Sequence, residues 1–407
     1  PLLAKYIRNL GVKPLDHFMV THLLKDGNRI AGCMGFDVLK GDVITVRCKT
    51  VVLCMGLTAQ RVSNNSSHKP FNQWFSPFVT GSQIMLPLKA GASVLNLDIS
   101  DMATMLPKGW GAPGMNGINN MGGHELNALG ERFMGKYDPM LENGLRRNQV
   151  MGTFQETLEG YGPPFFMDMT HFTAEDARHL QYDLMPGDKE TYLEYCEARK
   201  IDFTRTPLEV EIGERMIGGI VRSDATQETD VENLFNGNII HSFSGAMCLG
   251  YTAGGFAAHK AAGVEMPSLP EDVMERCLAE IYAPLENGGR GTVSWNVFED
   301  GIRQIMDYYV GYQRTEGSMK QALKSFETLA AYMPRIAAST LRELMRSHES
   351  MELFRLCRCY VQACMQRRES GRAMYRRADY PDLDPALAKC LVTRLDGSGT
   401  PFFHWND

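Results

Sequence analysis

The sequence is poor in the features that mark membrane proteins, nucleic-acid-binding proteins and secreted proteins. No run approaches the ~20 consecutive apolar residues of a membrane-spanning helix, so we predict no direct membrane span. The formal net charge of −6 gives no basic surface for phosphates, which argues against a nucleic-acid partner. The opening stretch PLLAKYIRNLGVKP has neither the apolar core nor the cleavage site of a signal peptide. We therefore expect a cytoplasmic protein.

Paired cysteines are also missing. The ten cysteines run from Cys33 to Cys390 without a C-x-x-C pair or another metal-ligand spacing. Three of them, Cys357, Cys359 and Cys364, lie in a stretch that predicts a helix, on which residues two positions apart point to different sides. We expect buried free thiols of a reducing compartment, no metal site, and no iron–sulfur cluster held by this chain alone.

The composition that remains is that of a globular protein, with 44% hydrophobic and 22% charged residues over 407 positions. A chain of this length predicts two or three domains. Residues 17–54 are β-rich runs separated by turn signals, and the last run, 50–54, is apolar without alternation. Such a run is typical of a parallel strand covered on both faces, and we expect it to end in a backbone bend at Met55-Gly56.

A second apolar run, 237–241, predicts another such strand, and the small residues of 244–263 suit a loop that passes into a closely packed helix. Residues 77–91 predict a helix, residues 99–130 predict loops rich in glycine and asparagine, and residues 267–377 predict mostly amphipathic helices. Strand-then-glycine units so far apart, with an insertion between them, predict an interrupted α/β nucleotide-binding domain.

One element of such a domain is missing. No predicted strand leads into a G-x-G-x-x-G turn, the device that puts a pyrophosphate on a helix N-terminus. Either the chain binds no nucleotide, or its first βαβ unit lies before residue 1. A start inside an apparent helix, without an initiating methionine, favours the second interpretation.

Five stretches together resemble the flavoprotein subunits of fumarate reductase, succinate dehydrogenase and adenylylsulfate reductase. They are, in order, KTVVLCMGLTAQR, TGSQIMLPLKAGASVLNLD, NALGERFMGKYDP, MIGGI and GRAMYRRADYPDLDP. In that family they correspond to the last FAD-domain strand, a Thr-Gly segment with its helix and strand, a capping-domain hairpin, the return from the cap, and a C-terminal motif. Each stretch alone is unspecific, and their shared order makes the resemblance specific.

The resemblance implies an α/β fold with an interrupted Rossmann-like FAD-binding domain, an inserted α+β capping domain and a C-terminal helical domain. The implied division gives the FAD-binding domain residues 1–98 and 215–266, the capping domain residues 99–214, and the helical domain residues 267–407. It also implies FAD as the cofactor, a small-molecule substrate, and a separate iron–sulfur electron-transfer partner, which makes the protein part of a hetero-oligomer.

The resemblance implies two sets of flavin-binding residues. The first set brings its backbone close to the cofactor, where small residues leave room: Met55, Gly56, Thr80 and Gly81. The second set opens a helix whose N-terminal positive charge faces the flavin ring: Leu249, Gly250, Tyr251 and Thr252. The alternative interpretation of the second set is a tight glycine turn before a packing helix.

Arg147 falls at the position of the family's catalytic arginine, which passes a proton to the substrate while the flavin passes a hydride. Because arginine donates a proton poorly, its other role is a charge clamp on developing negative charge. Arg146 is its neighbour, and the register could slip by one residue. Without the resemblance, the pair indicates two solvated arginines at a helix start.

The sequence departs from the dicarboxylate enzymes of the family. The stretch ISDMATMLP lacks their Phe-His-Pro turn, and Glu214 and Cys248 replace a histidine and an arginine that bind carboxylates. The stretch NGINNMGGHELN replaces a glutamate–arginine loop that relays protons. Because a site with these losses and an added carboxylate repels a dianion, fumarate and succinate are disfavoured as substrates.

Three residues are candidates for altered roles. His124 is either a substitute acid or base or simply an exposed histidine. Glu214 is either the base of a different reaction or a salt-bridged surface residue at a domain junction. His241 stands near the position of a missing glutamate that contacts the cofactor, and it could take up part of that contact.

The leading hypothesis is therefore an FAD-dependent oxidoreductase that serves as the flavoprotein subunit of an electron-transfer complex. It moves hydride or electrons between flavin and a small substrate other than fumarate or succinate. One alternative is a protein like the alpha subunit of adenylylsulfate reductase, which the C-terminal stretch RRADYPDLDP favours. The other is a non-catalytic flavin-binding or structural subunit of a redox complex.

Overall fold

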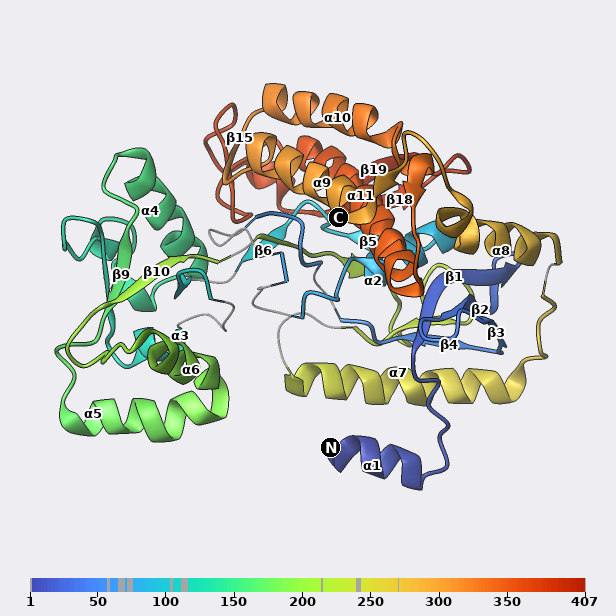
Figure 1. Ribbon diagram of the computed structural model, residues 1–407, viewed down its shortest axis with the longest axis horizontal. Coiled ribbons are helices and arrows are strands. Elements are labelled where there is room, and N and C mark those ends of the chain that lie inside the picture. The colour runs from blue at the N-terminus through green and yellow to red at the C-terminus, as the bar shows by residue number, and fades with distance from the viewer. Residues whose placement is uncertain are drawn as a thin grey trace.

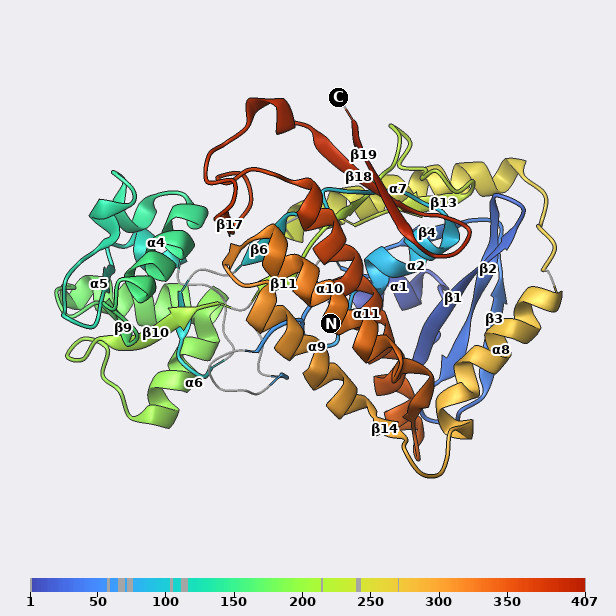
Figure 2. The ribbon, with the colours of Figure 1, turned by 90° about the horizontal axis from the view of Figure 1, so that it is seen from above.

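The structure consists of a larger body and a smaller cap lobe that lies to one side of it in both views (Figures 1 and 2). The computed structural model describes residues 2–56, 59–64, 70–71, 76–102, 105–110, 116–213, 215–238, 243–269 and 271–406. The cap lobe comprises residues 105–212, and the body comprises the described residues before and after it. No helix among the described residues is long and apolar enough to cross a bilayer.

An antiparallel meander of three strands opens the body after the isolated helix α1 (Leu2–Asn9). The strands are β1 (Phe18–Asp26), β2 (Arg29–Asp37) and β3 (Val43–Arg47). Gly27 makes the first turn with φ of 64°, a left-handed conformation that glycine adopts without strain. The turn-and-strand pattern of residues 17–54 is thereby confirmed.

A short parallel pair forms the part of the body that matters most for the site. Strand β4 (Val51–Leu53) pairs with β13 (Leu234–Asn236), and Leu53 lies opposite Asn236. Helix α7 (Phe243–Gly263) packs along both strands and runs beneath the body in Figure 1. Two segments that have the whole cap lobe between them in the sequence therefore lie side by side.

Another sheet of the body includes the two C-terminal strands, and its order is β12-β5-β18-β19. Its strands are β12 (Ile220–Val221), β5 (Val94–Leu95), β18 (Cys390–Leu395) and β19 (Pro401–Asn406). Helix α2 (Ser82–Ala90) precedes β5 and ends at Gly91, whose φ is 103°.

Four long helices cover the body on one side (Figure 1). They are α8 (Glu271–Glu286), α9 (Trp295–Tyr309), α10 (Glu316–Ala330) and α11 (Leu341–Gln366). The hydroxyl groups of Thr315 and Thr340 cap α10 and α11 by accepting hydrogen bonds from backbone N–H groups of the first turn. Short strand pairs flank these helices: β14 (Val293–Ser294) with β16 (Ile336–Ala337), and β15 (Gln313–Arg314) with β17 (Arg376–Arg377).

The cap lobe has an antiparallel sheet in the order β7-β10-β9-β8. Its strands are β7 (Met105–Pro107), β8 (His124–Leu126), β9 (Phe165–Asp168) and β10 (Leu208–Ile212). Its helices are α3 (Asn116–Asn120), α4 (Arg146–Leu158), α5 (Ala174–His179) and α6 (Glu190–Arg199), with a π-helical segment, Leu180–Lys189, between the last two.

A two-stranded antiparallel ribbon connects the lobes. Strand β6 (Ser100–Met102) enters the cap lobe, β11 (Arg215–Ile217) leaves it, and Met102 lies opposite Arg215. The cap lobe has a hydrophobic core of its own, which includes Phe133, Met167 and Tyr192. In the body, the strands around β4, β5 and β13 share one core with helices α9 to α11, and the meander strands β1 and β2 form another with α8 and the start of α11.

The local sequence patterns predicted the wrong bounds or type for three elements. Helix α2 begins at Ser82 rather than near Pro77, because Gly81 stands before it with φ of 94°. The strand predicted over 237–241 lies at β13 instead, and residues 239–242 are outside the described residues. The stretch 99–130, predicted as loops, contains three short strands and α3, because these strands depend on partners far away in sequence.

Candidate functional site

The carboxyl ends of β4 and β13 meet at one edge, which is where open α/β folds bind ligands. The backbone N–H of Gly237 donates to the carbonyl oxygen of Leu53 at 2.9 Å, so the chain stays paired just past the strands. A Cβ on Gly237 would lie 2.6 Å from Cys54 Sγ, which only glycine avoids. Met55 and Gly56 follow directly, and Gly56 bends the chain with φ of 88°.

The second predicted flavin segment lies beside the same edge. The side-chain amide of Gln227 donates to the carbonyl oxygens of Asn236 and Leu249 at 3.1 and 3.2 Å. Thr252 Oγ1 donates to Gln227 Oε1 at 2.5 Å. Gln227 therefore joins the middle of α7 to the end of β13 by hydrogen bonds. It thereby holds residues 249–252 next to the pair of β4 and β13, and β4 continues into Met55-Gly56.

The predicted helix start was wrong. Helix α7 begins at Phe243, so Leu249 to Thr252 form its second and third turns instead of opening it. Any effect of the helix N-terminus on a bound anion belongs to the turn after Phe243, because the partial charge falls off within one turn. Alanine favours a helix and glycine disfavours one, so their mixture in SGAMCLGYTAGGFAAHKAAG does not mark the boundary.

Thr80 and Gly81 lie near Gly56 but face the protein interior. Thr80 is 4% exposed, and Val79, which precedes it, lies against Gly56. A Cβ on Gly81 would meet Leu356 Cδ2 of α11 at 2.5 Å. The small residue at 81 is thus explained by helix packing, and its predicted contact with flavin stays a prediction.

Two features of this edge suit a bound ligand. Asn238, which follows Gly237, is 9% exposed, and its side-chain Nδ2 has no acceptor among the described residues. Gly250 has nothing within 4 Å of the position of a Cβ, and Tyr251 beside it is 85% exposed. A buried donor without an acceptor next to an open helix face is what a bound heterocycle with carbonyl groups requires.

Arg147 lies where the cap lobe touches the body. It occupies the first turn of α4, and its Nε and Nη2 donate to Asn148 Oδ1 at 3.3 and 2.9 Å. A Cβ on Gly371, in the loop after α11, would lie 3.2 Å from Arg147 Nη1. The ring of Phe154, on the same helix, packs against Tyr312 with centroids 5.3 Å apart. The guanidinium group thus spans the boundary between the lobes, half-buried beside the C-terminal motif.

His124 begins strand β8 of the cap lobe. Its ring stacks on that of His171, with centroids 4.1 Å apart and planes 12° apart. Burial lowers the pKa of His124, and the nearby charge of Arg132 lowers it further. His124 is therefore part of a cluster with residues that the sequence did not single out.

The neighbouring Glu125 is a buried acid that sequence reasoning missed. Desolvation and the charge of Glu142 raise the pKa of Glu125 to about 8. Gln149 of α4 donates to Glu125 Oε1, while Glu142 is paired with Arg132. The Glu125 carboxyl group therefore keeps its proton near neutral pH. The signal that could have found it is the alternation of strand β8, which turns Glu125 into the core.

One glycine pattern was overlooked in the sequence. Residues 109–114, GWGAPG, have the G-x-G-x-x-G spacing and follow strand β7. Strand β7 pairs antiparallel with β10, however, and the N–H of Gly109 donates to a carboxylate oxygen of Glu211 at 3.0 Å. An antiparallel strand and a carboxylate on the amide do not suit a pyrophosphate at the described start of the pattern, and residues 111–114 lie outside the described residues.

Two predicted site residues, Glu214 and His241, lie outside the described residues. Cys248, which stands where the family has an arginine, is an exposed free cysteine on α7. The structure thus places Gly56 against Val79, close to Gly81, and links residues 249–252 through Gln227 to β13, which pairs with β4. It places Arg147 and His124 separately in the cap lobe.

Two family models match the chain. Residues 1–292 match the model of an FAD binding domain, and residues 299–397 match that of the fumarate reductase flavoprotein C-term. The chain belongs to the FAD-binding flavoprotein family. FAD is the cofactor of this flavoprotein, as the resemblance in the sequence implied.

Relatives of the flavoprotein agree with this assignment. It is 23% identical over 394 residues to an uncharacterised FAD-dependent oxidoreductase of Methanocaldococcus jannaschii, a match that covers 93% of this chain and 70% of the relative. It is also 23% identical over 405 residues to a fumarate reductase (CoM/CoB) subunit of Methanothermobacter marburgensis, covering 94% of this chain and 70% of the relative.

Solved structures confirm the fold. A chain of E. coli quinol fumarate reductase matches with a TM-score of 0.84 at 19% identity, covering 100% of the flavoprotein and 73% of that chain. An adenosine-5-phosphosulfate reductase in complex with sulfite matches with a TM-score of 0.83 at 20% identity, covering 95% and 72%. The predicted α/β fold with an FAD-binding domain, an inserted cap and C-terminal helices is confirmed.

Proposed function

We propose that this flavoprotein is the FAD-bearing subunit of an electron-transfer complex, and that it moves hydride or electrons between flavin and a small substrate. That it is an FAD-dependent oxidoreductase follows from its family. The role within a complex is carried over from the relative that is named as one subunit of a fumarate reductase. The electron partner, an iron–sulfur protein, is carried over from the family resemblance of the motifs.

The observation that carries the proposal is the edge formed by β4, β13 and α7. Gln227 joins the end of β13 to α7, while Gly56 and Asn238 extend from the two paired strands. FAD, when bound, supplies the ring that accepts or donates the hydride. The chain supplies the bend at Gly56, the unpaired donor of Asn238 and the open helix face at Gly250 that together position such a ring.

Arg147 is the proposed charge clamp on the substrate. It reaches from the cap lobe toward Gly371 of the body, so a substrate held between the lobes meets its guanidinium group. Guanidinium stays positive at neutral pH and stabilises negative charge that develops as the substrate is reduced. Glu214 remains the proposed base for a reaction that removes a proton.

Fumarate and succinate are proposed not to be the substrates. Cys248 supplies no positive charge where the family has a carboxylate-binding arginine. The second candidate is chemistry like that of adenylylsulfate reductase, favoured by the C-terminal stretch that contains Arg377 and Asp379. In the structure these two residues form a two-pronged ion pair, with both N···O distances at 2.9 Å, which shapes the loop opposite Arg147.

The decisive experiment is purification of the native complex through this chain, followed by anaerobic absorbance spectroscopy. We expect a flavin band that bleaches with a donor substrate and returns with an acceptor. Succinate with fumarate, and sulfite plus AMP with adenylylsulfate, are the two pairs to compare. Turnover with succinate or fumarate would contradict the substrate proposal, and absence of a flavin band would favour a structural role.

Arg147→Ala gives the sharper test of the site. It should retain the flavin band and lose turnover by about 10²-fold or more, the usual effect of removing a group that stabilises transition-state charge. Arg146→Ala is the matched control, because it removes the same charge one residue away on the same helix turn. Loss of turnover in Arg146→Ala with normal turnover in Arg147→Ala would shift the catalytic role to Arg146.

A further inference from the structure

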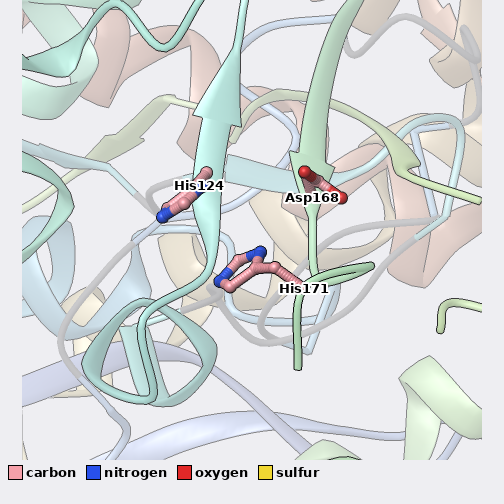
Figure 3. A group of neighbouring side chains, drawn as sticks. All are labelled: His124, Asp168 and His171. Atoms are coloured by element: carbon pink, nitrogen blue, oxygen red, sulfur yellow. The ribbon is translucent and has the colours of Figure 1, made fainter. Parts of the chain in front are cut away.

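His124, Asp168 and His171 converge at one edge of the cap sheet (Figure 3). His124 begins β8 and lies directly opposite Asp168, the last residue of the neighbouring antiparallel strand β9. His171 follows in the turn after β9. Each of the three side chains offers a nitrogen or oxygen atom, and these three atoms lie within 4.8 Å of one another.

Hydrogen bonds already orient two of these groups. His171 Nε2 lies 2.9 Å from the carbonyl oxygen of Gly122, and because a carbonyl only accepts, Nε2 must carry the proton. That leaves the lone pair on Nδ1. Asp168 Oδ1 accepts from the backbone N–H and the hydroxyl of Thr170 at 2.9 and 2.7 Å, which leaves Oδ2 available. Metal-binding histidines and carboxylates are typically held by outer hydrogen bonds of this kind.

We propose that His124, Asp168 and His171 form a binding site for a divalent transition-metal ion, with Zn²⁺ as the preferred ion. Two imidazoles and one carboxylate are the ligands that zinc favours, whereas calcium and magnesium prefer oxygen alone. Three protein ligands leave a fourth tetrahedral position for water. The site lies in the cap lobe and does not depend on the proposed function.

Binding the ion requires the two imidazole rings to leave their stacked arrangement, because nearly parallel rings cannot both direct an in-plane lone pair at one ion. Tetrahedral coordination at zinc–ligand distances of about 2.0–2.1 Å places two ligand atoms about 3.4 Å apart, so the widest separation must also close by up to roughly 1.4 Å. His171 is exposed and lies in a turn, which lets its ring move. The partly buried ring of His124 and the partly buried carboxylate of Asp168 exclude some of the water that would compete for the ion.

The charges around the site suit a cation. Asp168 contributes one negative charge. Arg132, the cation nearest His124 in electrostatic effect, is held by Glu142 through contacts of 2.6 and 2.9 Å, so its charge is compensated. A bound ion would clamp the β8–β9 pair to the turn at His171 and thereby stabilise the cap lobe against unfolding.

The test is zinc titration of the metal-stripped protein by calorimetry. The unaltered protein should bind one equivalent at this site with a micromolar or lower Kd and a raised cap-lobe Tm. His124→Ala, His171→Ala and Asp168→Asn should each weaken that binding at least tenfold. His179→Ala is the matched control, because His179 forms an exposed 2.9 Å pair with Asp183 and belongs to no described three-residue cluster, so this variant should bind like the unaltered protein.

Cobalt spectroscopy separates this site from the ten cysteines. Co²⁺ at two imidazoles and a carboxylate should give visible d–d bands without the charge-transfer band of a cobalt–thiolate bond. Equal zinc affinity in the unaltered protein and His124→Ala, or cobalt bound only through thiolates, would overturn the proposal. Loss of turnover in His124→Ala with zinc affinity unchanged would also overturn it and assign His124 to acid–base chemistry.

Discussion

Glu125 shows how burial changes the chemistry of a single residue. Its side chain is fully buried in the cap lobe, and desolvation together with Glu142 raises its pKa to about 8. The native state therefore holds this proton at neutral pH, whereas the unfolded chain releases it near the ordinary value of 4.5. Because the native state binds more protons between these two values, the stability of the cap lobe falls as pH rises through this range.

Glu125→Gln should remove this pH dependence. Between pH 4.5 and 8 the unaltered cap lobe should lose about 1.4 kcal/mol of stability per pH unit that the variant keeps. Thermal unfolding across this range measures the difference. Glu175→Gln, which changes an exposed glutamate of α5, is the control and should follow the unaltered protein. Parallel curves for Glu125→Gln and the unaltered protein would show that Glu125 is ionised at neutral pH.

The sequence could identify residues only where a motif carries them. Arg147 and Gly56 stand in stretches with a family counterpart, so their positions could be proposed. His124 was visible as a histidine in a loop, but Asp168 and His171 were not, because they join it only through the register of β8 and β9. The side-chain neighbours of a residue depend on tertiary pairing that no local pattern records.

At the scale of elements, helices and strands with strong local sequence patterns could be predicted, and those with weak patterns could not. The meander β1 to β3 follows from its turn residues, and α8 to α10 follow from their apolar periodicity. Helix α11 is buried on several sides and lacks that periodicity, so its predicted amphipathic character is wrong. Strands β5 to β7 have two or three residues each, too few for an alternating pattern to appear. Their existence depends on partners elsewhere in the chain, so they could not be predicted from the sequence.

Helix α7 offers a test of the flavin edge that does not perturb packing. Gly250 has open space at its Cβ position, so Gly250→Val should leave the fold intact and change helix stability by less than about 1 kcal/mol. If flavin lies against this face, the added side chain should loosen or expel it. Flavin content per protein, read from absorbance, is the measurement.

Gly255→Val is the matched control for this helix. Gly255 also has nothing within 4 Å of its Cβ position, and five residues further along it points about 140° away around the helix. This variant should keep its flavin. Full flavin retention in Gly250→Val would mean that the cofactor lies elsewhere, and equal loss in both variants would point to a general effect on α7.

At the scale of the whole molecule, the described residues of the cap lobe have one hydrophobic core and those of the body have two, and none of these cores is shared between the lobes, which predicts separate thermal transitions for cap and body. Arg367, at the end of α11, forms a buried ion pair with Asp98 and Glu369 that joins the helices to the strands of the body. Arg367→Met leaves a buried carboxylate unpaired and should destabilise the body by about 3–5 kcal/mol. Differential scanning calorimetry should show the body transition at a lower temperature and the cap transition unchanged.

Met167→Ala supplies the reciprocal variant. Met167 is fully buried in the core of the cap lobe, and its truncation should lower only the cap transition, by about 2–5 kcal/mol of stability. If Arg367→Met and Met167→Ala moved the same transition, the two lobes would unfold as one cooperative unit.

The ribbon of β6 and β11 means that the chain leaves the body and returns to it at adjacent points. An insertion whose ends are neighbours can be exchanged for another domain, or for a tight turn from Met102 to Arg215, while the surrounding sheet keeps its pairing. Replacement of the cap lobe can therefore change the substrate specificity during evolution while the body, which holds the cofactor, keeps its structure.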